Sequence, residues 1–203
     1  MDAQEREAAD ITLEYYAANA EAFASSTVDV AFSSVQKCFE GLLQPGARVL
    51  DFGCGSGRDA KHFLEAGFAV DAVDGSPELC RIASELTGLP VRCMRFEELS
   101  AQSIYDGIWA CSSILHVPSR QLLALLAKMA AALKPGGVVY TSFKLGEFEG
   151  VRNGRYFSDF TPESFARLLD KVPALREEEH WISGDARPGR EDEKWLNLIL
   201  RKN

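Results

Sequence analysis

The sequence lacks paired cysteines, an excess of basic residues and any long apolar run. Its five cysteines are odd in number and never closer than 13 residues (93 − 80), so we expect neither a disulfide framework nor a zinc site. Lys and Arg number 22 against 30 Asp and Glu, and this net charge of −8 disfavours a nucleic-acid partner held by many phosphate contacts. No stretch approaches about 18 apolar residues, and no basic start precedes an apolar run, so neither a membrane span nor a signal peptide is expected. The sequence predicts a reduced, cytoplasmic protein without a bound metal.

The apolar content suffices for one core. Of 203 residues, 46% are apolar, which predicts a single globular domain. Residues 1 to about 45 place apolar side chains at helical spacing until Pro45 and Gly46 break the pattern. We therefore divide the domain into an N-terminal helical cap, residues 1–45, and a core, residues 46–203.

From Ala47 onward, apolar runs of strand length alternate with helical segments. Strands are expected at about 47–53, 68–74, 90–95, 105–111 and 137–143, with helices at about 57–66, 77–87 and 119–133. This alternation predicts an α/β fold, a doubly wound and mostly parallel sheet with helices on both faces. A loop at 144–160, a helix capped by Thr161 and an antiparallel pair near 176–183 and 194–201 complete the prediction.

A glycine-rich segment joins the first predicted strand of the core to its first helix. Residues 51–58 read Asp-Phe-Gly-Cys-Gly-Ser-Gly-Arg. Glycines at alternate positions let the backbone turn sharply and approach a ligand, and the helix start offers free N–H groups. This predicts a cradle for a nucleotide-type cofactor. The dinucleotide pattern G-x-G-x-x-G is not met, because the third glycine comes one residue early.

A carboxylate ends the second predicted strand. Asp74 lies 21 residues (74 − 53) after the first glycine of the loop. At that position a carboxylate can accept hydrogen bonds from both hydroxyls of a cofactor ribose. The alternative is an acid at a helix N-terminus, although Ser76 and Pro77 already supply start signals for the next helix.

Four segments within residues 47–144 together resemble the class I S-adenosylmethionine (SAM)-dependent methyltransferases. D-x-G-x-G-x-G at 51–57 is similar to motif I, and the strand ending in Asp74 follows it. Y-D-G-I-W-A-C-S at 105–112 is similar to motif IV, and L-K-P-G-G-V-V-Y at 133–140 to the turn into strand five. The resemblance implies a seven-stranded sheet of order 3-2-1-4-5-7-6 with the last strand antiparallel. It also implies SAM as cofactor and S-adenosylhomocysteine (SAH) as product.

The resemblance further implies where SAM would lie. Its amino-acid end would be lined by Asp51, Gly53, Gly55 and Gly57. Arg58 would contact the SAM carboxylate or cap the following helix, and Asp74 with Gly75 would hold the ribose.

The third predicted strand departs from the family pattern. Members commonly have an Asp there that meets adenine, whereas Arg95 cannot accept a hydrogen bond. Adenine recognition would then depend on Phe96 and Glu97, the alternative being that Glu97 belongs to a solvated loop. Cys111 lies in motif IV at the floor of the predicted active site. It and Cys54 either offer thiolates for metalloid chemistry or are small apolar fillers.

Methyl transfer from a sulfonium is an in-line displacement that needs positioning and exclusion of water. A general base is required only when the acceptor carries its proton. His116, just past the fourth strand, is the candidate for binding or deprotonating the acceptor. The alternative is a histidine that packs the loop.

Cations gather in the loops that the fold places at the active-site edge. They are Lys144, Arg152, Arg155, Arg187 and Arg190, with Tyr156 nearby. They could bind a small anionic acceptor through charge-assisted hydrogen bonds. The alternative is ordinary solvated loops, with Arg190 paired to Glu191, Asp192 or Glu193.

The N-terminal stretch 15–23 resembles the Y-x-x-x-A-x-x-[FY] helix that small-molecule members lay over the SAM pocket, with Tyr15 or Tyr16 near the methionine end. Plain core aromatics are the alternative. Gly-Arg-Asp at 57–59 is similar to the tellurite-resistance branch, which does not identify the substrate.

The predicted function is methyl transfer to a small-molecule acceptor. The absence of N/D-P-P-Y/F after strand four argues against DNA bases as acceptors. The rival hypotheses are a non-catalytic SAM-binding module and an NAD-dependent oxidoreductase. We expect a monomer or a weak homodimer.

Overall fold

A seven-stranded sheet organises the computed structural model, which describes residues 3–27, 30, 32–187, 189–190 and 192–203. The strands lie in the order β3-β2-β1-β4-β5-β9-β8, and β9 runs antiparallel to both of its neighbours. Since the two other strands form a separate hairpin, this is the predicted order 3-2-1-4-5-7-6, and the fold prediction is confirmed. The strands of the sheet are β1 (Arg48–Phe52), β2 (Ala69–Asp74), β3 (Arg92–Cys93), β4 (Tyr105–Ala110), β5 (Leu133–Lys144), β8 (Leu175–Gly184) and β9 (Lys194–Lys202).

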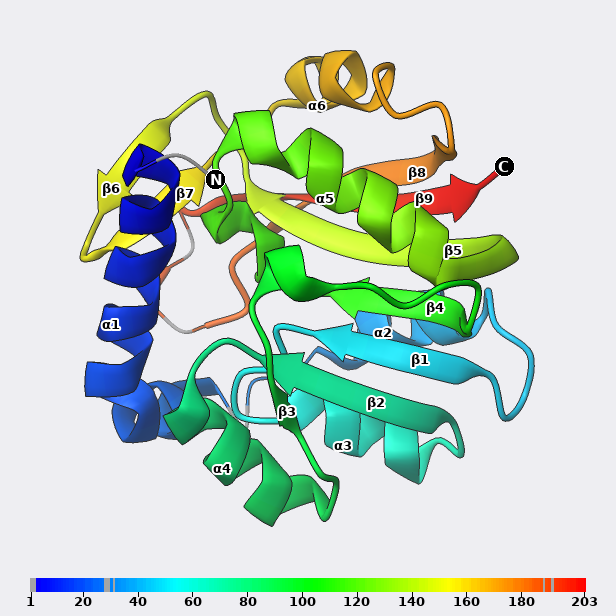
Figure 1. Cartoon of the computed structure of the whole chain (residues 1–203), viewed down its shortest axis with the longest axis horizontal. Helices are drawn as coiled ribbons and strands as arrows, with labels where there is room; N and C mark the ends of the chain where they lie inside the picture. Colours follow the sequence, from blue (N-terminus) through cyan, green and yellow to red (C-terminus); the bar gives the residue numbers. More distant parts are fainter. Residues whose placement is uncertain (1–2, 28–29, 31, 188, 191) are drawn as a thin grey trace.

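Helices cover both faces of the sheet, and one further helix lies across the ends of its strands (Figure 1). One face carries α2 (Ser33–Glu40), α3 (Arg58–Glu65) and α4 (Pro77–Thr87). The other carries α5 (Ser119–Ala132) and α6 (Pro162–Leu169). The long α1 (Ala3–Thr27) lies across the carboxyl ends of the parallel strands, where ligands bind in open α/β sheets (Figure 1).

Alternating side chains of the central strands fill two cores. Val49 and Trp109 point to the face covered by α2 and α3, where Phe39 of α2 packs on Trp109 with ring centroids 5.2 Å apart. Leu50 and Ile108 point to the face covered by α5. The central strands β1 and β4 are therefore buried on both faces, which is why apolar residues occupy successive positions in them.

Helix starts are set by local sequence. Thr161 Oγ1 accepts the Ser164 N–H at 3.2 Å and Pro162 occupies the first helical position, as the sequence predicts. Ser76 caps α4 in the same way.

The predicted loop at 144–160 is wrong in part, because it contains a hairpin of β6 (Glu149–Arg152) and β7 (Arg155–Ser158). Asn153 and Gly154 form its two-residue turn, with φ of 51° and 75°. Asn-Gly is the preferred pair for such a turn, so a usable signal was present in the sequence. The third strand is also shorter than predicted, and two 3-10 turns follow β3 (Phe96–Glu98) and β4 (Ile114–His116).

Candidate functional site

The glycine loop between β1 and α3 adopts backbone angles that favour glycine. Gly53, Gly55 and Gly57 have φ of 84°, 56° and 86°. A Cβ on Gly53 would lie 2.5 Å from the Ser113 Cβ, and one on Gly57 would lie 3.0 Å from Ala83. The glycines therefore permit both the turn and the close packing of the loop on its neighbours.

The Asp74 carboxylate is fixed beside this loop. Its Oδ2 accepts the Gly55 N–H and its Oδ1 the Ser76 N–H, both at 2.9 Å. Burial raises the pKa of Asp74, while these backbone hydrogen bonds oppose that rise. Each carboxylate oxygen keeps a further lone pair for a ligand hydroxyl.

A cavity of about 560 Å³ lies between the loop, α1 and the β6–β7 hairpin. It brings together most of the residues singled out in the sequence. Those that line it are Tyr16, Gly53, Cys54, Gly55, Arg58, Asp74, Gly75, Phe96, Glu97, Cys111, His116, Lys144, Arg152, Arg155, Arg187 and Arg190. Four other candidates from the sequence are not part of the lining: Tyr15, Asp51, Gly57 and Tyr156.

Asp51 is buried under the loop, only 2% exposed. Its Oδ2 has no hydrogen-bond partner among the described residues. Burial, and then the nearby charge of Asp59, raise the pKa of Asp51. A protonated carboxyl fits this environment better than a carboxylate facing a ligand.

Asp59 is a central residue that sequence reasoning missed. Its Oδ1 accepts the Gln36 amide at 2.7 Å, and its Oδ2 accepts the Trp109 indole N–H at 2.9 Å. Arg58 donates to both oxygens at 2.8 Å. Arg58 is thus committed to its sequence neighbour, and Asp59 joins α2, α3 and β4 behind the loop. Asp59 stands in the Gly-Arg-Asp of residues 57–59, but sequence reasoning assigned it no role, because its partners lie 23 and 50 positions away.

The end of β3 supplies an aromatic wall. The Phe96 ring packs edge-on against Phe52, with centroids 4.8 Å apart, and borders Gly53. Arg95 also lines the cavity and donates to Asp10 of α1 at 2.6 Å. Across the cavity, burial raises the pKa of Cys111 to about 12, so its thiol is protonated near neutral pH.

His116 is buried and lies between α1 and the hairpin. Its Nε2 is 3.0 Å from the Tyr16 hydroxyl, and its Nδ1 is 2.6 Å from the Tyr156 carbonyl oxygen. The Tyr156 side chain points elsewhere, its hydroxyl donating to Glu149 at 2.9 Å. Tyr156 therefore reaches the site only through its main chain, which disagrees with the predicted role of its side chain.

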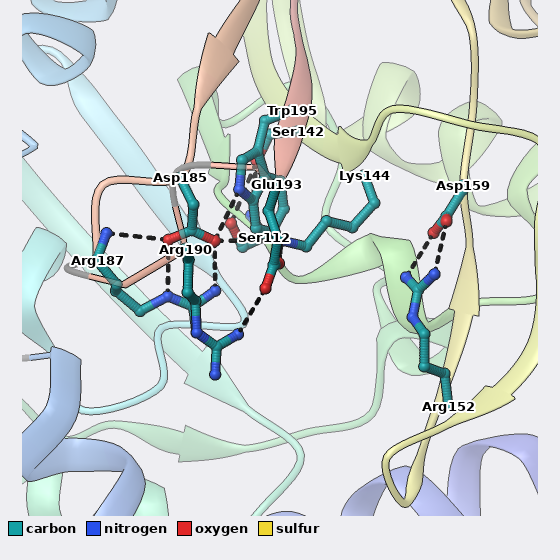
Figure 2. Close-up of polar contacts among 10 residues, drawn as sticks. All are labelled: Ser112, Ser142, Lys144, Arg152, Asp159, Asp185, Arg187, Arg190, Glu193 and Trp195. Atoms are coloured by element: carbon teal, nitrogen blue, oxygen red, sulfur yellow. Dashed lines mark hydrogen bonds and ion pairs between the residues drawn. The ribbon is translucent and has the colours of Figure 1, made fainter.

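Carboxylates neutralise two of the predicted acceptor-binding cations (Figure 2). Arg152 donates to both oxygens of Asp159, at 2.9 and 3.0 Å. Arg187 donates to both oxygens of Asp185, at 2.8 and 2.6 Å. Such bidentate pairs leave little free charge for an anion.

The remaining cations divide into two kinds. Lys144 and Arg190 both pair with Glu193, Arg190 at 3.3 Å, while Glu191 lies outside the described residues (Figure 2). Within the described part of the rim, Arg155 is the predicted cation that has no carboxylate partner. It lies instead over the Tyr15 ring, 4.6 Å from the centroid.

Two kinds of feature are absent from the described residues. No helix there is long and apolar enough to cross a membrane. No group of three or more His, Cys, Asp or Glu side chains in this part of the chain could hold a metal ion.

The fold and the glycine-loop site define a Rossmann-like methyltransferase, and a family comparison agrees. Residues 17–184 match the model of a family described as a methyltransferase domain. The chain belongs to this family, and the resemblance to class I SAM-dependent methyltransferases is confirmed.

Similar proteins give the same class. A ubiquinone biosynthesis O-methyltransferase of Xanthomonas campestris pv. campestris (strain B100) is 34% identical over 105 residues, which are 48% of this chain and 43% of the relative. The chain thus aligns with less than half the length of this curated relative.

Solved structures share the fold over nearly the whole chain. The 1,6-didemethyltoxoflavin-N1-methyltransferase of Burkholderia thailandensis has a TM-score of 0.82 at 24% identity, covering 100% of this chain and 92% of its own. The magnesium protoporphyrin IX methyltransferase of Synechocystis PCC 6803 has a TM-score of 0.71 at 15% identity, covering 94% and 95%.

Proposed function

We propose that this protein transfers the methyl group of SAM to a small-molecule acceptor and releases SAH. The observation that carries the proposal is the Asp74 carboxylate, which lines the cavity from the end of β2 and is anchored to the glycine loop. Family membership supports methyl transfer, and two structural neighbours were crystallised with SAH or SAM.

The residues present fit SAM. Asp74 offers carboxylate lone pairs to a ribose, and the Phe96 ring and Glu97 offer a wall for adenine. The left-handed turns at Gly53 and Gly55 leave the loop backbone free of side chains at the cavity floor. When bound, SAM supplies an electrophilic methyl group on its sulfonium.

The chain's own residues perform the binding and the exclusion of water. Tyr16 and Phe23 of α1 close the cavity over the loop, their rings packed edge to face at 5.1 Å. Enclosure of this kind strengthens electrostatic contacts and keeps water from the reacting atoms. No covalent enzyme intermediate is needed, because positioning the acceptor in line with the methyl group suffices.

The test is calorimetry with SAM, SAH and NAD as separate ligands. We expect SAM and SAH to bind and NAD not to bind. Asp74→Asn should weaken SAH binding roughly 10- to 100-fold, since hydrogen bonds to charged groups contribute about 1.5–3 kcal/mol. Asp71→Asn is the matched control, because Asp71 lies on the same strand but pairs with exposed Arg48 at 2.8 Å. Binding of NAD without SAM would refute the proposal.

Four finer predictions accompany this function. A reducing compartment such as the cytoplasm is supported by five free thiols, of which Cys93 is exposed. An anionic acceptor stays a prediction, which now depends on Arg155 because the other rim cations are paired. The tellurite-resistance likeness and the monomer or weak homodimer also stay predictions.

A further inference from the structure

Three distant parts of the chain bring polar groups together at the acceptor side of the cavity. Tyr16 comes from α1, His116 from the turn after β4, and Arg155 from β7. The Tyr16 hydroxyl is 3.0 Å from His116 Nε2 and 3.4 Å from Arg155 Nη1. These contacts join residues 100 and 139 positions apart.

Hydrogen-bond chemistry fixes the protons in this cluster. The Tyr156 carbonyl oxygen can only accept, so His116 Nδ1, 2.6 Å away, carries its proton. In the neutral imidazole Nε2 is then an acceptor, and the Tyr16 hydroxyl donates to it. The Tyr16 oxygen consequently presents only acceptor capacity to a ligand in the cavity.

Electrostatics keep this arrangement at ordinary pH. Burial, together with the charges of Arg155 and Arg152, lowers the pKa of His116 to about 4, although the hydrogen bond to the Tyr156 carbonyl opposes this. Burial raises the pKa of Tyr16, while Arg155 lowers it in part. His116 is therefore neutral and Tyr16 protonated near pH 7.

Arg155 supplies a hydrogen-bond donor beside this acceptor. Its guanidinium lies over the rings of Tyr15 and Phe157, 4.6 and 5.2 Å from their centroids. Its Nε is buried and has no hydrogen-bond partner among the described residues. A buried donor without a partner is costly, so an oxygen of a bound molecule would satisfy it.

From this we infer an acceptor in which a protic N–H or O–H stands next to a carbonyl oxygen. Tyr16 Oη accepts from the protic group while Arg155 donates to the carbonyl oxygen, and Tyr16 passes the proton on to His116. This inference rests on the proposed function and names its substrate class. A neutral acceptor agrees with the paired state of the other rim cations, and in this inference it takes the place of the anionic acceptor predicted from the sequence.

The step balances in atoms and charge. The acceptor heteroatom uses its electron pair to bond the methyl carbon, and the carbon–sulfur bond breaks with its pair remaining on sulfur. The acceptor proton moves to Tyr16 Oη as the Tyr16 proton moves to His116 Nε2. One positive charge leaves sulfur and one appears on His116.

The weak basicity of His116 restricts the acceptor further. A base whose pKa is about 4 removes a proton only from a group that becomes strongly acidic as the methyl adds. A lactam nitrogen or an enol-type oxygen meets this condition. An alkylamine does not, because its methylated ammonium has a pKa near that of lysine, about 10.4.

The first test reads the proton positions directly. In ¹⁵N NMR of the SAH complex we expect His116 as the Nδ1–H tautomer, neutral down to about pH 4. His116→Gln assigns its signal among the three histidines, and Tyr16→Phe should shift the Nε2 resonance. An Nε2–H tautomer, or titration near 6.5, would overturn the inference.

The second test uses defined probes with the whole chain. Lumazine and uracil serve as lactams, nicotinate as a carboxylate and benzylamine as an alkylamine. We expect a lactam to bind the SAH complex and to be methylated with SAM. Tyr16→Phe and His116→Gln should then lower kcat about 100-fold or more with less than a tenfold change in KM. Arg155→Met should mainly raise KM.

Tyr105→Phe is the control and should leave kcat unchanged, because Tyr105 lies at the start of β4 and does not line the cavity. Binding of nicotinate or benzylamine in place of both lactams would overturn the inference, as would a Tyr16→Phe enzyme that keeps more than a tenth of the original kcat. Failure of the unaltered protein to bind SAH would instead refute the proposed function.

Discussion

Buried ionisable residues, more than the residues of the motif, connect the site to the rest of the protein. Asp59 holds together α2, α3 and β4 through Gln36, Arg58 and Trp109. His116 joins α1 to the β6–β7 hairpin through Tyr16 and the Tyr156 carbonyl. Each of these residues has its function only because groups from other segments surround it.

Asp59→Ala should destabilise the fold by roughly 3–5 kcal/mol, because it leaves the part-buried Arg58 charge and the buried Trp109 N–H without their partner. Urea denaturation measures this change. Asp106→Ala is the control: its pair with Lys134 is partly exposed, so about 1 kcal/mol or less is expected. Equal losses of unfolding free energy in the two variants would contradict the central position of Asp59.

His116 should make the fold sensitive to acid. An unfolded histidine titrates near 6.5, whereas the folded pKa is about 4, so the unfolded chain binds more protons between these values. Stability is therefore lost as pH falls through this window, by up to about 3 kcal/mol. His116→Gln should abolish this part of the pH dependence in urea denaturation at pH 7 and 4.5. His180→Gln, at an exposed site, should retain it.

At the scale of elements, the glycine loop and the hairpin are both turns, but they place different demands on their residues. The loop must pack its glycines against neighbouring elements, as Gly53 does on Ser113. The hairpin needs only the positive φ of Asn153 and Gly154 at its tip. The loop is therefore sensitive to added volume as well as to backbone strain.

Two glycine substitutions separate the effect of backbone strain from the effect of added side-chain volume. Gly67 has φ of 88°, and no atom of the described residues lies within 4 Å of a Cβ placed there, so Gly67→Ala should cost about 1–2 kcal/mol of backbone strain. Gly53→Ala adds overlap with Ser113, which is held by its 2.6 Å hydrogen bond to the Phe52 carbonyl oxygen. A further cost of about 1–3 kcal/mol is expected, together with weaker SAH binding. Similar urea midpoints for the two variants would contradict the overlap.

At the scale of the whole molecule, β1 and β4 lie side by side at the point where the strand order reverses (Figure 1). The glycine loop leaves β1 there, and the segment containing His116 leaves β4. With α1 across the strand ends, the cavity is enclosed by elements from both halves of the chain. A ligand that fills it should therefore stabilise the entire fold.

SAH at 100 times its Kd should stabilise the protein by about 2.7 kcal/mol. For a chain of this size that corresponds to a rise in Tm of about 5–10 °C. Differential scanning calorimetry with SAH, and with NAD at equal concentration, measures it. A rise with NAD and none with SAH would contradict the assigned cofactor class.

Much of the fold could be predicted because its signals are local. Apolar runs, Ser76 and Thr161 as helix caps, and the glycine loop act within a few residues, and each was found where expected. The hairpin was missed although Asn153-Gly154 marked it, because the flanking strands are short and do not alternate clearly.

The sequence by itself determined the strand–helix alternation, the turn at the glycine loop and the carboxylate at the end of β2, since backbone preference and side-chain periodicity are properties of neighbouring residues. Only the tertiary structure decided which charges meet. It paired Arg152 with Asp159 and Arg187 with Asp185, left Arg155 among aromatic rings, and set Tyr16 against His116. Those pairings depend on burial and on contacts between segments, which no local pattern specifies.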